Sequence, residues 1–202
     1  MILFVRHGQT AVNREGRLQG RLDPPLTDLG LDQARLAANG LADCGATLVL
    51  TSPLQRAAGT AAEIARVLGV PVEVDDRLVE LDYGDWDGRK LGEVSPAEWE
   101  QWRRDPSFAP PGGESLETVG RRVAEFCTEW SGPERTVVAV SHVSPIKAAV
   151  VWALGVADAT SWRMHLDVAS ITRIGSRGGG PPFLAGYNDT SHLHPRDDPP
   201  AA

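Results

Sequence analysis

Short apolar segments alternate along the chain with segments of helical periodicity, and this alternation restricts the fold more than any other feature. The first apolar segment is ILFV at residues 2–5, followed directly by Arg6 and His7. Similar segments are TLVLTS at 47–52 and TVVAVSH at 136–142. Apolar runs of this length are typical of strands buried on both faces of a parallel sheet, with helices as crossover connections.

The same pattern predicts the order of elements. We expect strands at 2–5, 47–52, 70–75, 136–142, 168–175 and 182–188, and helices at 26–45, 52–69, 95–105, 115–131 and 144–155. Thr27 and Ser52 are the predicted N-caps of the first two helices, the first of which should end near Gly45. The predicted fold is α/β: a three-layer α/β/α sandwich with a mostly parallel central sheet and helices on both faces.

The chain of 202 residues is expected to form a single domain over residues 1–190. The stretch 76–113 breaks the alternation and contains the Pro- and Gly-rich segment PSFAPPGG, so we interpret it as a small helical excursion that covers the active site as a lid. Residues 191–202 are polar and are predicted to be a disordered tail.

Charge and cysteine content narrow the class of partner. The net charge of −7 argues against nucleic acid or an anionic membrane surface. No apolar stretch approaches the roughly 20 residues of a transmembrane helix. Cys44 and Cys127 lie far apart, which disfavours a zinc site and suits the reducing cytoplasm. We expect a cytoplasmic protein with no metal and no cofactor, and the sequence leaves a homodimer open.

Two predicted strands end in histidine, and other polar residues follow the remaining strands. His7 and His142 come at strand ends, Arg56 lies in the first turn of the helix after the second strand, and Glu80 begins the excursion. The carboxyl ends of parallel strands meet at one edge of a sheet, where ligands bind. We therefore expect these residues and Arg6 to form one site.

This set of side chains suits phosphoryl transfer. Arginines are bidentate donors to a tetrahedral dianion, and a neutral histidine can attack phosphorus. A second, protonated histidine can stabilise charge on the equatorial oxygens. Glu80 in a dry pocket could supply the proton that the leaving alkoxide needs, with Asp82, Asp85 and Asp87 as alternatives for this role. The scheme requires no metal.

The segment RHGQTAVN resembles the signature of the histidine phosphatase superfamily, the phosphoglycerate mutase-like proteins. The match continues in order through LTDLGLDQA, TSPLQRAAGTA, RLVELDYGDWDG, PPGGES and VSHVSPIKA, and spans about residues 2–190. The order of motifs looks closest to the broad-specificity and α-ribazole phosphatase-like members. The resemblance implies the superfamily fold and phosphatase chemistry.

By this resemblance His7 is the phosphorylated nucleophile, Glu80 the proton donor, and Arg6, Arg56 and His142 the residues that hold the phosphoryl group. The implied substrate-binding residues are Asn13, Gln19, Gly20 and Val143. Asn13 could equally shape its loop. Val143 is a departure, because many members have glycine after the second histidine; its side chain should narrow the pocket, while its N–H could still face phosphate.

We therefore predict a metal-independent phosphomonoester hydrolase that acts through a phosphohistidine on a small phosphorylated metabolite. The alternative is a cofactor-dependent phosphoglycerate mutase, which must exclude water and, by resemblance, needs a longer and more cationic excursion than this one. A third reading is a catalytically silent phosphate-binding protein, which the complete set of histidines, arginines and Glu80 disfavours.

Overall fold

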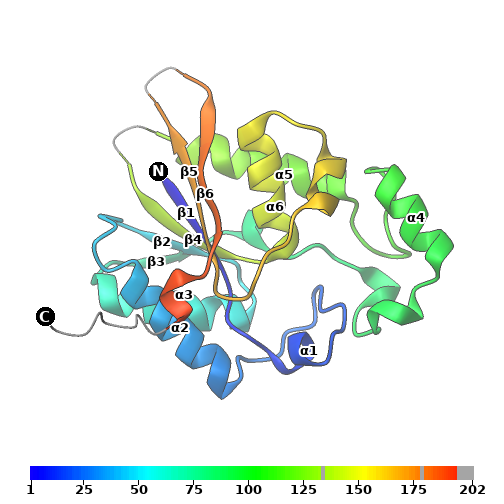
Figure 1. Ribbon diagram of the computed structural model, residues 1–202, viewed down its shortest axis with the longest axis horizontal. Helices are drawn as coiled ribbons and strands as arrows, with labels where there is room; N and C mark the ends of the chain where they lie inside the picture. Colours follow the sequence, from blue (N-terminus) through cyan, green and yellow to red (C-terminus); the bar gives the residue numbers. More distant parts are fainter. Residues whose placement is uncertain (133–134, 178–179, 195–202) are drawn as a thin grey trace, which may run out of the picture.

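A six-stranded sheet forms the middle layer of the protein. Its structure is a computed structural model that describes residues 1–132, 135–177 and 180–194 (Figure 1). The strand order is β3-β2-β4-β1-β5-β6. The strands are β1 (Ile2–Arg6), β2 (Val49–Thr51), β3 (Val72–Val74), β4 (Val137–Ser141), β5 (Ile171–Ser176) and β6 (Pro182–Asp189). The first four are mutually parallel, whereas β5 and β6 pair antiparallel, so the sheet is mostly parallel as predicted.

Helices cover both faces of this sheet. They are α1 (Ala11–Arg14), α2 (Asp28–Gly40), α3 (Gln55–Leu68), α4 (Pro96–Arg104), α5 (Leu116–Trp130) and α6 (Val143–Leu154). Short 3-10 turns occur at Asp76–Leu78, Gly84–Trp86, Leu91–Glu93, Asp158–Arg163 and Ser191–Leu193. In Figure 1, α2 and α3 lie together on one side of the sheet, while α5 and α6 lie together on the other. The predicted α/β/α sandwich is confirmed.

Alternate residues of the central strands supply the two cores. In β1, Ile2 and Phe4 belong to the core beneath α5 and α6, whereas Leu3 and Val5 belong to the core beneath α2 and α3. All four side chains are buried, because successive residues of a strand point to opposite faces and both faces are covered. Burial of each such side chain stabilises the fold by about 1.5–3 kcal/mol. The continuous apolar run thus follows from the layer arrangement.

Three helix boundaries differ from the predicted ones. Helix α2 ends at Gly40 rather than near Gly45, because the backbone after Gly40 closes in tighter turns, from Leu41 N–H to Ala38 and from Cys44 N–H to Leu41. Helix α3 begins at Gln55 with Leu54 as its N-cap, so the prediction that Ser52 caps it was wrong.

Helix α6 begins at Val143, one residue before the predicted start at Ser144. His142 is its N-cap, with extended backbone angles. The strand β4 therefore passes directly into the helix at His142, which fixes this histidine at the junction of two regular elements. The functional site depends on that junction.

The segment 76–113 carries three of the 3-10 turns and α4, which has Ser95 as its N-cap, close to the predicted start at residue 95. Helix α4 lies at the periphery of the molecule, at the right of Figure 1. Ser191–Leu193 form a 3-10 turn, although they were predicted to belong to a disordered tail; residues 195–202 of that tail lie outside the described residues. No helix in the described parts of the chain is both long and apolar enough to cross a membrane.

Candidate functional site

Two adjacent parallel strands bring the predicted histidines together. His7 follows β1 and His142 follows β4, and the register of these strands pairs Arg6 with Ser141. The two imidazole rings have their centroids 5.0 Å apart and are tilted by 57°. His7 is 3% exposed and His142 is 0% exposed. The expectation that both rings meet at the carboxyl edge of the sheet is met by this geometry.

Arg56 lies between the two rings. Its Nε is 3.3 Å from Nε2 of His7 and 3.2 Å from Nδ1 of His142, so one N–H is shared between two ring nitrogens. The Nη atoms donate to the carbonyls of Leu22 at 2.6 Å and Gly20 at 2.8 Å. Burial lowers the pKa of Arg56 to about 10, so the guanidinium stays charged at neutral pH.

The hydrogen bonds of His7 fix its tautomer. Its Nδ1 is 2.7 Å from the carbonyl oxygen of Gly8, which can only accept, so Nδ1 carries the proton and Nε2 the lone pair. The pKa of His7 lies well below its ordinary value, because the ring is buried and the cations Arg56 and Arg6 are close. His7 is therefore neutral at physiological pH, with a nucleophilic nitrogen directed toward Arg56.

His142 has the opposite tautomer. Its Nδ1 accepts from Arg56, and its Nε2 lies 2.7 Å from the hydroxyl of Ser52, to which it donates. Burial, followed by the charge of Arg56, holds the pKa of His142 well below its ordinary value. The expectation of a protonated second histidine is therefore not met in the protein alone. A dianion placed beside the ring would favour the charged form by direct attraction.

Glu80 is 5% exposed and is held by backbone N–H groups. Its Oε1 accepts from Leu81 at 2.8 Å and from Ser144 at 3.1 Å, and its Oε2 accepts from Val143 at 3.1 Å. Val143 and Ser144 are in the first turn of α6, where the helix dipole favours a negative charge. The sequence left open that the N–H of Val143 faces phosphate; in the structure it donates to Glu80. One position on Oε2 is left for a proton.

Arg6 completes the cationic part of the site. It ends β1, and its Nη1 donates to the carbonyl of Leu166. Burial lowers the pKa of Arg6, and the nearby charge of Glu80 opposes this effect. The predicted catalytic set of His7, Glu80, His142, Arg6 and Arg56 is therefore brought to one place, where two cations and two neutral imidazoles can surround a phosphoryl group.

Three of the predicted substrate-binding residues contact protein groups instead. Asn13 accepts hydrogen bonds from the N–H and hydroxyl of Thr10, which shapes the loop before α1. The buried carboxamide of Gln19 lies between Thr10 and Arg56, and its oxygen accepts from Nη1 of Arg56 at 2.9 Å. Gly20 binds Arg56 through its carbonyl. Their direct contact with a substrate stays a prediction.

Two residues of the site had no role assigned from the sequence. Ser52 was interpreted as a helix cap, but its hydroxyl orients His142. Its position at the end of β2 was the available signal, because side chains there face the same edge as the histidines. Lys147 lies one turn after Val143 in α6. The one signal for it in the sequence was its spacing of four residues from Val143 within the predicted helix, which places both on the same helix face.

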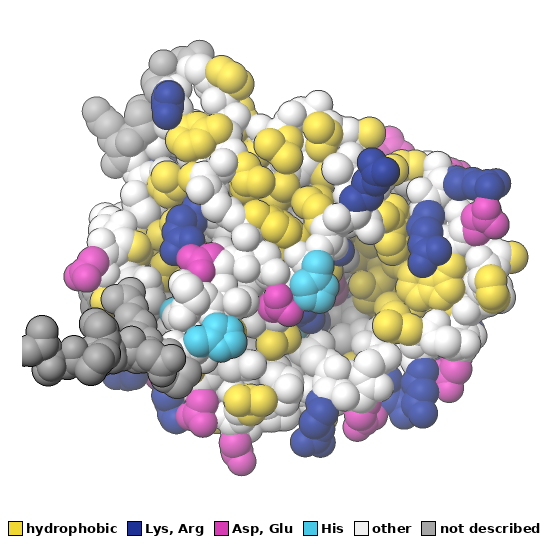
Figure 2. Space-filling view, in the orientation of Figure 1, with side chains coloured by type: hydrophobic (Ala, Val, Ile, Leu, Met, Phe, Trp, Pro, Cys, Tyr) yellow, Lys and Arg dark blue, Asp and Glu magenta, His cyan; other side chains and the backbone are white. Residues whose placement is uncertain are grey.

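A cavity of about 370 Å³ adjoins the site. It is lined by Arg6, Leu18, Tyr83, Leu91, Trp99, Trp102, Leu116, Val143, Ser144, Lys147, Ser161 and Trp162. Figure 2 shows the hollow beside α4, bordered by hydrophobic side chains. Trp99 and Trp102 were interpreted as packing residues; they do stack on each other, with centroids 5.5 Å apart, and they also form a wall of this cavity.

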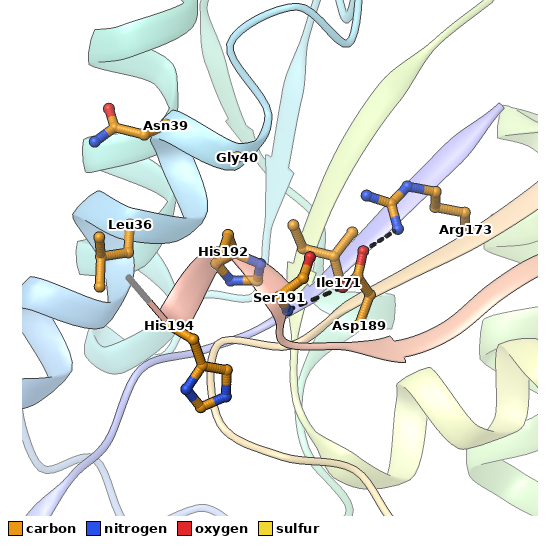
Figure 3. Close-up of a pocket in the computed structure, with 9 residues that line it drawn as sticks. All are labelled: Leu36, Asn39, Gly40, Ile171, Arg173, Asp189, Ser191, His192 and His194. Atoms are coloured by element: carbon orange, nitrogen blue, oxygen red, sulfur yellow. Dashed lines mark hydrogen bonds and ion pairs between the residues drawn. The ribbon is translucent and has the colours of Figure 1, made fainter. Parts of the chain in front are cut away.

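A second hollow, of about 360 Å³, lies between α2 and the end of β6 (Figure 3). His192 points into it and has its Nε2 3.0 Å from the carbonyl of Ala169. Among the described residues, this hollow shares no lining residue with the cavity beside Arg6. Among the described residues, no group of three or more His, Cys, Asp or Glu is placed to hold a metal ion.

Known proteins match this chain over nearly all of its length. The family model described as "Histidine phosphatase superfamily (branch 1)" matches residues 2–190. The bifunctional protein Rv2228c of Mycobacterium tuberculosis is 39% identical over 200 residues, which cover 95% of this chain and 54% of that protein. The chain thus spans about half the length of the first curated relatives that it matches.

Two further relatives are matched over most of their own length. Phosphoserine phosphatase 1 of Hydrogenobacter thermophilus is 37% identical over 182 residues, which cover 86% of this chain and 85% of the relative. The solved structure of a mycobacterial glucosyl-3-phosphoglycerate phosphatase superposes with a TM-score of 0.85 at 32% identity, and covers 94% of this chain and 99% of that chain. The closer likeness to α-ribazole phosphatases stays a prediction.

Proposed function

The chain belongs to the histidine phosphatase superfamily, and from this premise we propose that it is a metal-independent phosphomonoester hydrolase that acts through a phosphohistidine on a small phosphorylated metabolite. The observation that carries the proposal is the position of Arg56, whose Nε lies 3.3 Å from His7 and 3.2 Å from His142. A cation held between two neutral imidazoles marks where a phosphoryl dianion would be bound.

In the first step, Nε2 of His7 attacks phosphorus and the bond from phosphorus to the ester oxygen breaks. Arg6, Arg56 and His142 hold the phosphoryl oxygens and stabilise the charge on them. The departing oxygen takes a proton from Glu80, through the position on Oε2 that the backbone leaves open. The proton on Nδ1 of His7 stays on that nitrogen and is donated in a hydrogen bond to the Gly8 carbonyl, which stabilises the ring as it gains charge.

In the second step, water attacks the phosphohistidine and gives its proton to the Glu80 carboxylate. The bond from phosphorus to Nε2 breaks, phosphate leaves, and His7 returns to its neutral form. Glu80 is thereby protonated again for the next turnover. Both steps use in-line displacement, so the leaving group and the water occupy the same side of the phosphoryl group, opposite His7.

Hydrolysis is favoured over phosphoglycerate mutation by the relatives, two of which are named as phosphatases. The names of these two relatives refer to phosphoserine and glucosyl-3-phosphoglycerate, both small phosphate monoesters. A mutase must retain its intermediate and exclude water, whereas the excursion here has few basic residues to hold one. A silent phosphate-binding protein has no need of the buried acid Glu80.

The experiment is to trap the intermediate. Protein mixed with a phosphate ester labelled with ³²P should carry a phosphoryl group that survives alkali and is lost in acid, and His7→Ala should carry none. His165→Ala is the matched control, because this histidine is 81% exposed and belongs to neither the cavity nor the ring pair. A label that survives acid, or that persists in His7→Ala, would contradict the proposal. Isomerisation of 3-phosphoglycerate without release of phosphate would indicate the mutase.

A further inference from the structure

Two cationic side chains line the cavity that adjoins the histidine pair, and the proposed mechanism uses one of them. That one is Arg6, to which the mechanism assigns the phosphoryl group. Lys147 projects from α6 four residues after Val143, so it lies on the same helix face, about 6 Å further along the helix axis. Lys147 thus lines the cavity within reach of the charges of Glu80 and Arg6, on the side where the mechanism places the departing alcohol.

Lys147 has no paired carboxylate in the described part of the chain. Every ion pair closer than 4.0 Å there joins an arginine or His165 to an acid. Burial lowers the pKa of Lys147; Glu80 acts in the opposite direction, and Arg6 adds to the lowering. A half-buried ammonium without a partner is costly, and a ligand that brings an anion removes that cost.

The remaining wall of the cavity determines where such an anion can bind. It is formed mostly by aromatic and aliphatic side chains, those of Leu18, Tyr83, Leu91, Trp99, Trp102, Leu116, Val143 and Trp162, together with Ser144 and Ser161. These groups accommodate carbon atoms and rings and can donate single hydrogen bonds, but none of them carries a charge to neutralise an anion. Any charge on the leaving group is therefore directed to Lys147, the one cation of the described lining besides Arg6.

We propose that Lys147 is a specificity-determining residue that binds a carboxylate on the leaving alcohol of the substrate. A monoanion matches the single ammonium, whereas a second phosphate would bring two negative charges close to Glu80. The inference rests on the proposed function, and it assigns the substrates to phosphorylated hydroxy acids with the carboxylate near the ester. The apolar wall then packs against whatever else the alcohol carries.

The test uses ester pairs that differ in the carboxylate alone or nearly so: 3-phosphoglycerate with glycerol 3-phosphate, and O-phosphoserine with phosphoethanolamine. All four release a primary alcohol, so their demand for a proton from Glu80 is similar. We expect kcat/KM of the wild-type protein to favour the carboxylate member by at least tenfold. Lys147→Met should remove most of that preference through KM, and Lys147→Arg should keep part of it.

Lys90→Met is the matched control, because Lys90 is the other lysine of the chain and is exposed; it should leave the ratio unchanged. Equal turnover of both members by the wild type would overturn the proposal. An equal loss for both members in Lys147→Met would also overturn it, since that would assign the amine to the phosphoryl group or to the fold.

A binding measurement separates this proposal from the proposed function. His7→Ala cannot form the phosphohistidine, so the dissociation constants of 3-phosphoglycerate and glycerol 3-phosphate are measured on it by calorimetry, with and without Lys147→Met. Tighter binding of 3-phosphoglycerate that is lost with Lys147 supports the carboxylate site even if p-nitrophenyl phosphate is not hydrolysed. Equal binding of the two esters rejects the site even if hydrolysis is observed.

Discussion

Replacing Glu80 with glutamine exchanges one oxygen of a buried carboxylate for an amide nitrogen. The contacts of Glu80 allow the loss of stability and the loss of catalytic rate to be considered separately. Oε1 accepts two backbone N–H groups, so the amide oxygen will take that place. The amide nitrogen then faces the N–H of Val143, which loses its acceptor at 3.1 Å. The variant therefore loses both a hydrogen bond and the proton that the leaving group needs.

The cost in stability follows from the unpaired donor. A buried N–H without an acceptor costs about 1–3 kcal/mol. In a chain of this size each kcal/mol lowers the melting temperature by about 2–4 °C, so we expect a decrease of about 2–12 °C. Thermal unfolding followed by circular dichroism measures it. All kinetic assays must be made well below the lower of the two melting temperatures.

The cost in catalysis should depend on the leaving group. General acid catalysis contributes about 10²–10⁴ in rate when the departing oxygen is a poor leaving group, and little when it is a stabilised phenolate. Glu80→Gln should therefore lower kcat/KM of alkyl phosphates by about 10²–10⁴ while lowering that of p-nitrophenyl phosphate much less. The assay is kcat/KM for a series of phosphate monoesters, plotted against the pKa of the alcohol, because this ratio reports the step in which the alcohol leaves and not the later hydrolysis of the phosphohistidine. The wild-type slope should be shallow and that of the variant steep.

The three neighbouring aspartates provide the controls. Asp82→Asn, Asp85→Asn and Asp87→Asn remove the other acids that the sequence offered for the proton transfer, and none should change the slope. If Glu80→Gln lowers kcat/KM of all esters by the same factor, Glu80 acts as a structural anchor of α6 and not as the proton donor. If Asp82→Asn produces the steep slope instead, the acid has been assigned to the wrong residue.

Three further expectations follow from the same contacts. First, the buried rings of His7 and His142 have lowered pKa values, so below the ordinary imidazole value near 6.5 the unfolded chain binds protons that the folded protein does not. The free energy of unfolding should fall as the pH drops through this region, by up to about 1.4 kcal/mol per pH unit for each ring. Urea titrations from pH 7.5 to 5 measure this change. A flat profile would show that the rings are protonated in the folded state. Second, Ser52→Ala removes the partner of His142 at 2.7 Å and should lower kcat/KM for p-nitrophenyl phosphate by about tenfold, whereas Ser107→Ala at an exposed turn should not. Third, a Cβ at Gly20 would lie 1.9 Å from Oδ1 of Asp87, so Gly20→Ala should destabilise the protein and disturb the carbonyl that holds Arg56. Gly16 has a similar positive φ but nothing within 4 Å of its Cβ position, so Gly16→Ala reports the backbone strain alone. Equal urea midpoints and equal activities for the two variants would exclude the crowding at Gly20.

The position of the catalytic side chains was predictable because it depends on topology. A strand buried on both faces can be recognised from its apolar run, and parallel strands place their carboxyl ends at one edge. ILFV and VVAV therefore determine where His7 and His142 lie before any contact is known. Arg56 follows from the same reasoning, because it lies in the first turn after β2.

The side-chain hydrogen bonds could not be predicted, because each joins segments distant in the sequence. Ser52 is a good N-cap residue by its type and its following proline. In the folded protein its hydroxyl accepts from the N–H of Leu54 at 3.3 Å and also binds His142, 90 residues later, and the helix begins three residues further on. The local contact is kept, but the bond to His142 is a tertiary contact that the local sequence does not reveal.

The contact between Val143 and Glu80 shows how such a hydrogen bond changes the chemistry. Two N–H groups in the first turn of α6 are a ready anion site, and a substrate phosphate would be the obvious occupant. Here the protein's own carboxylate, 63 residues earlier in the chain, takes both donors. The phosphoryl oxygens are then left to the side chains of Arg6, Arg56 and His142. The backbone of α6 instead positions the acid, so the side chain of Val143 affects the cavity without altering the groups that hold phosphate.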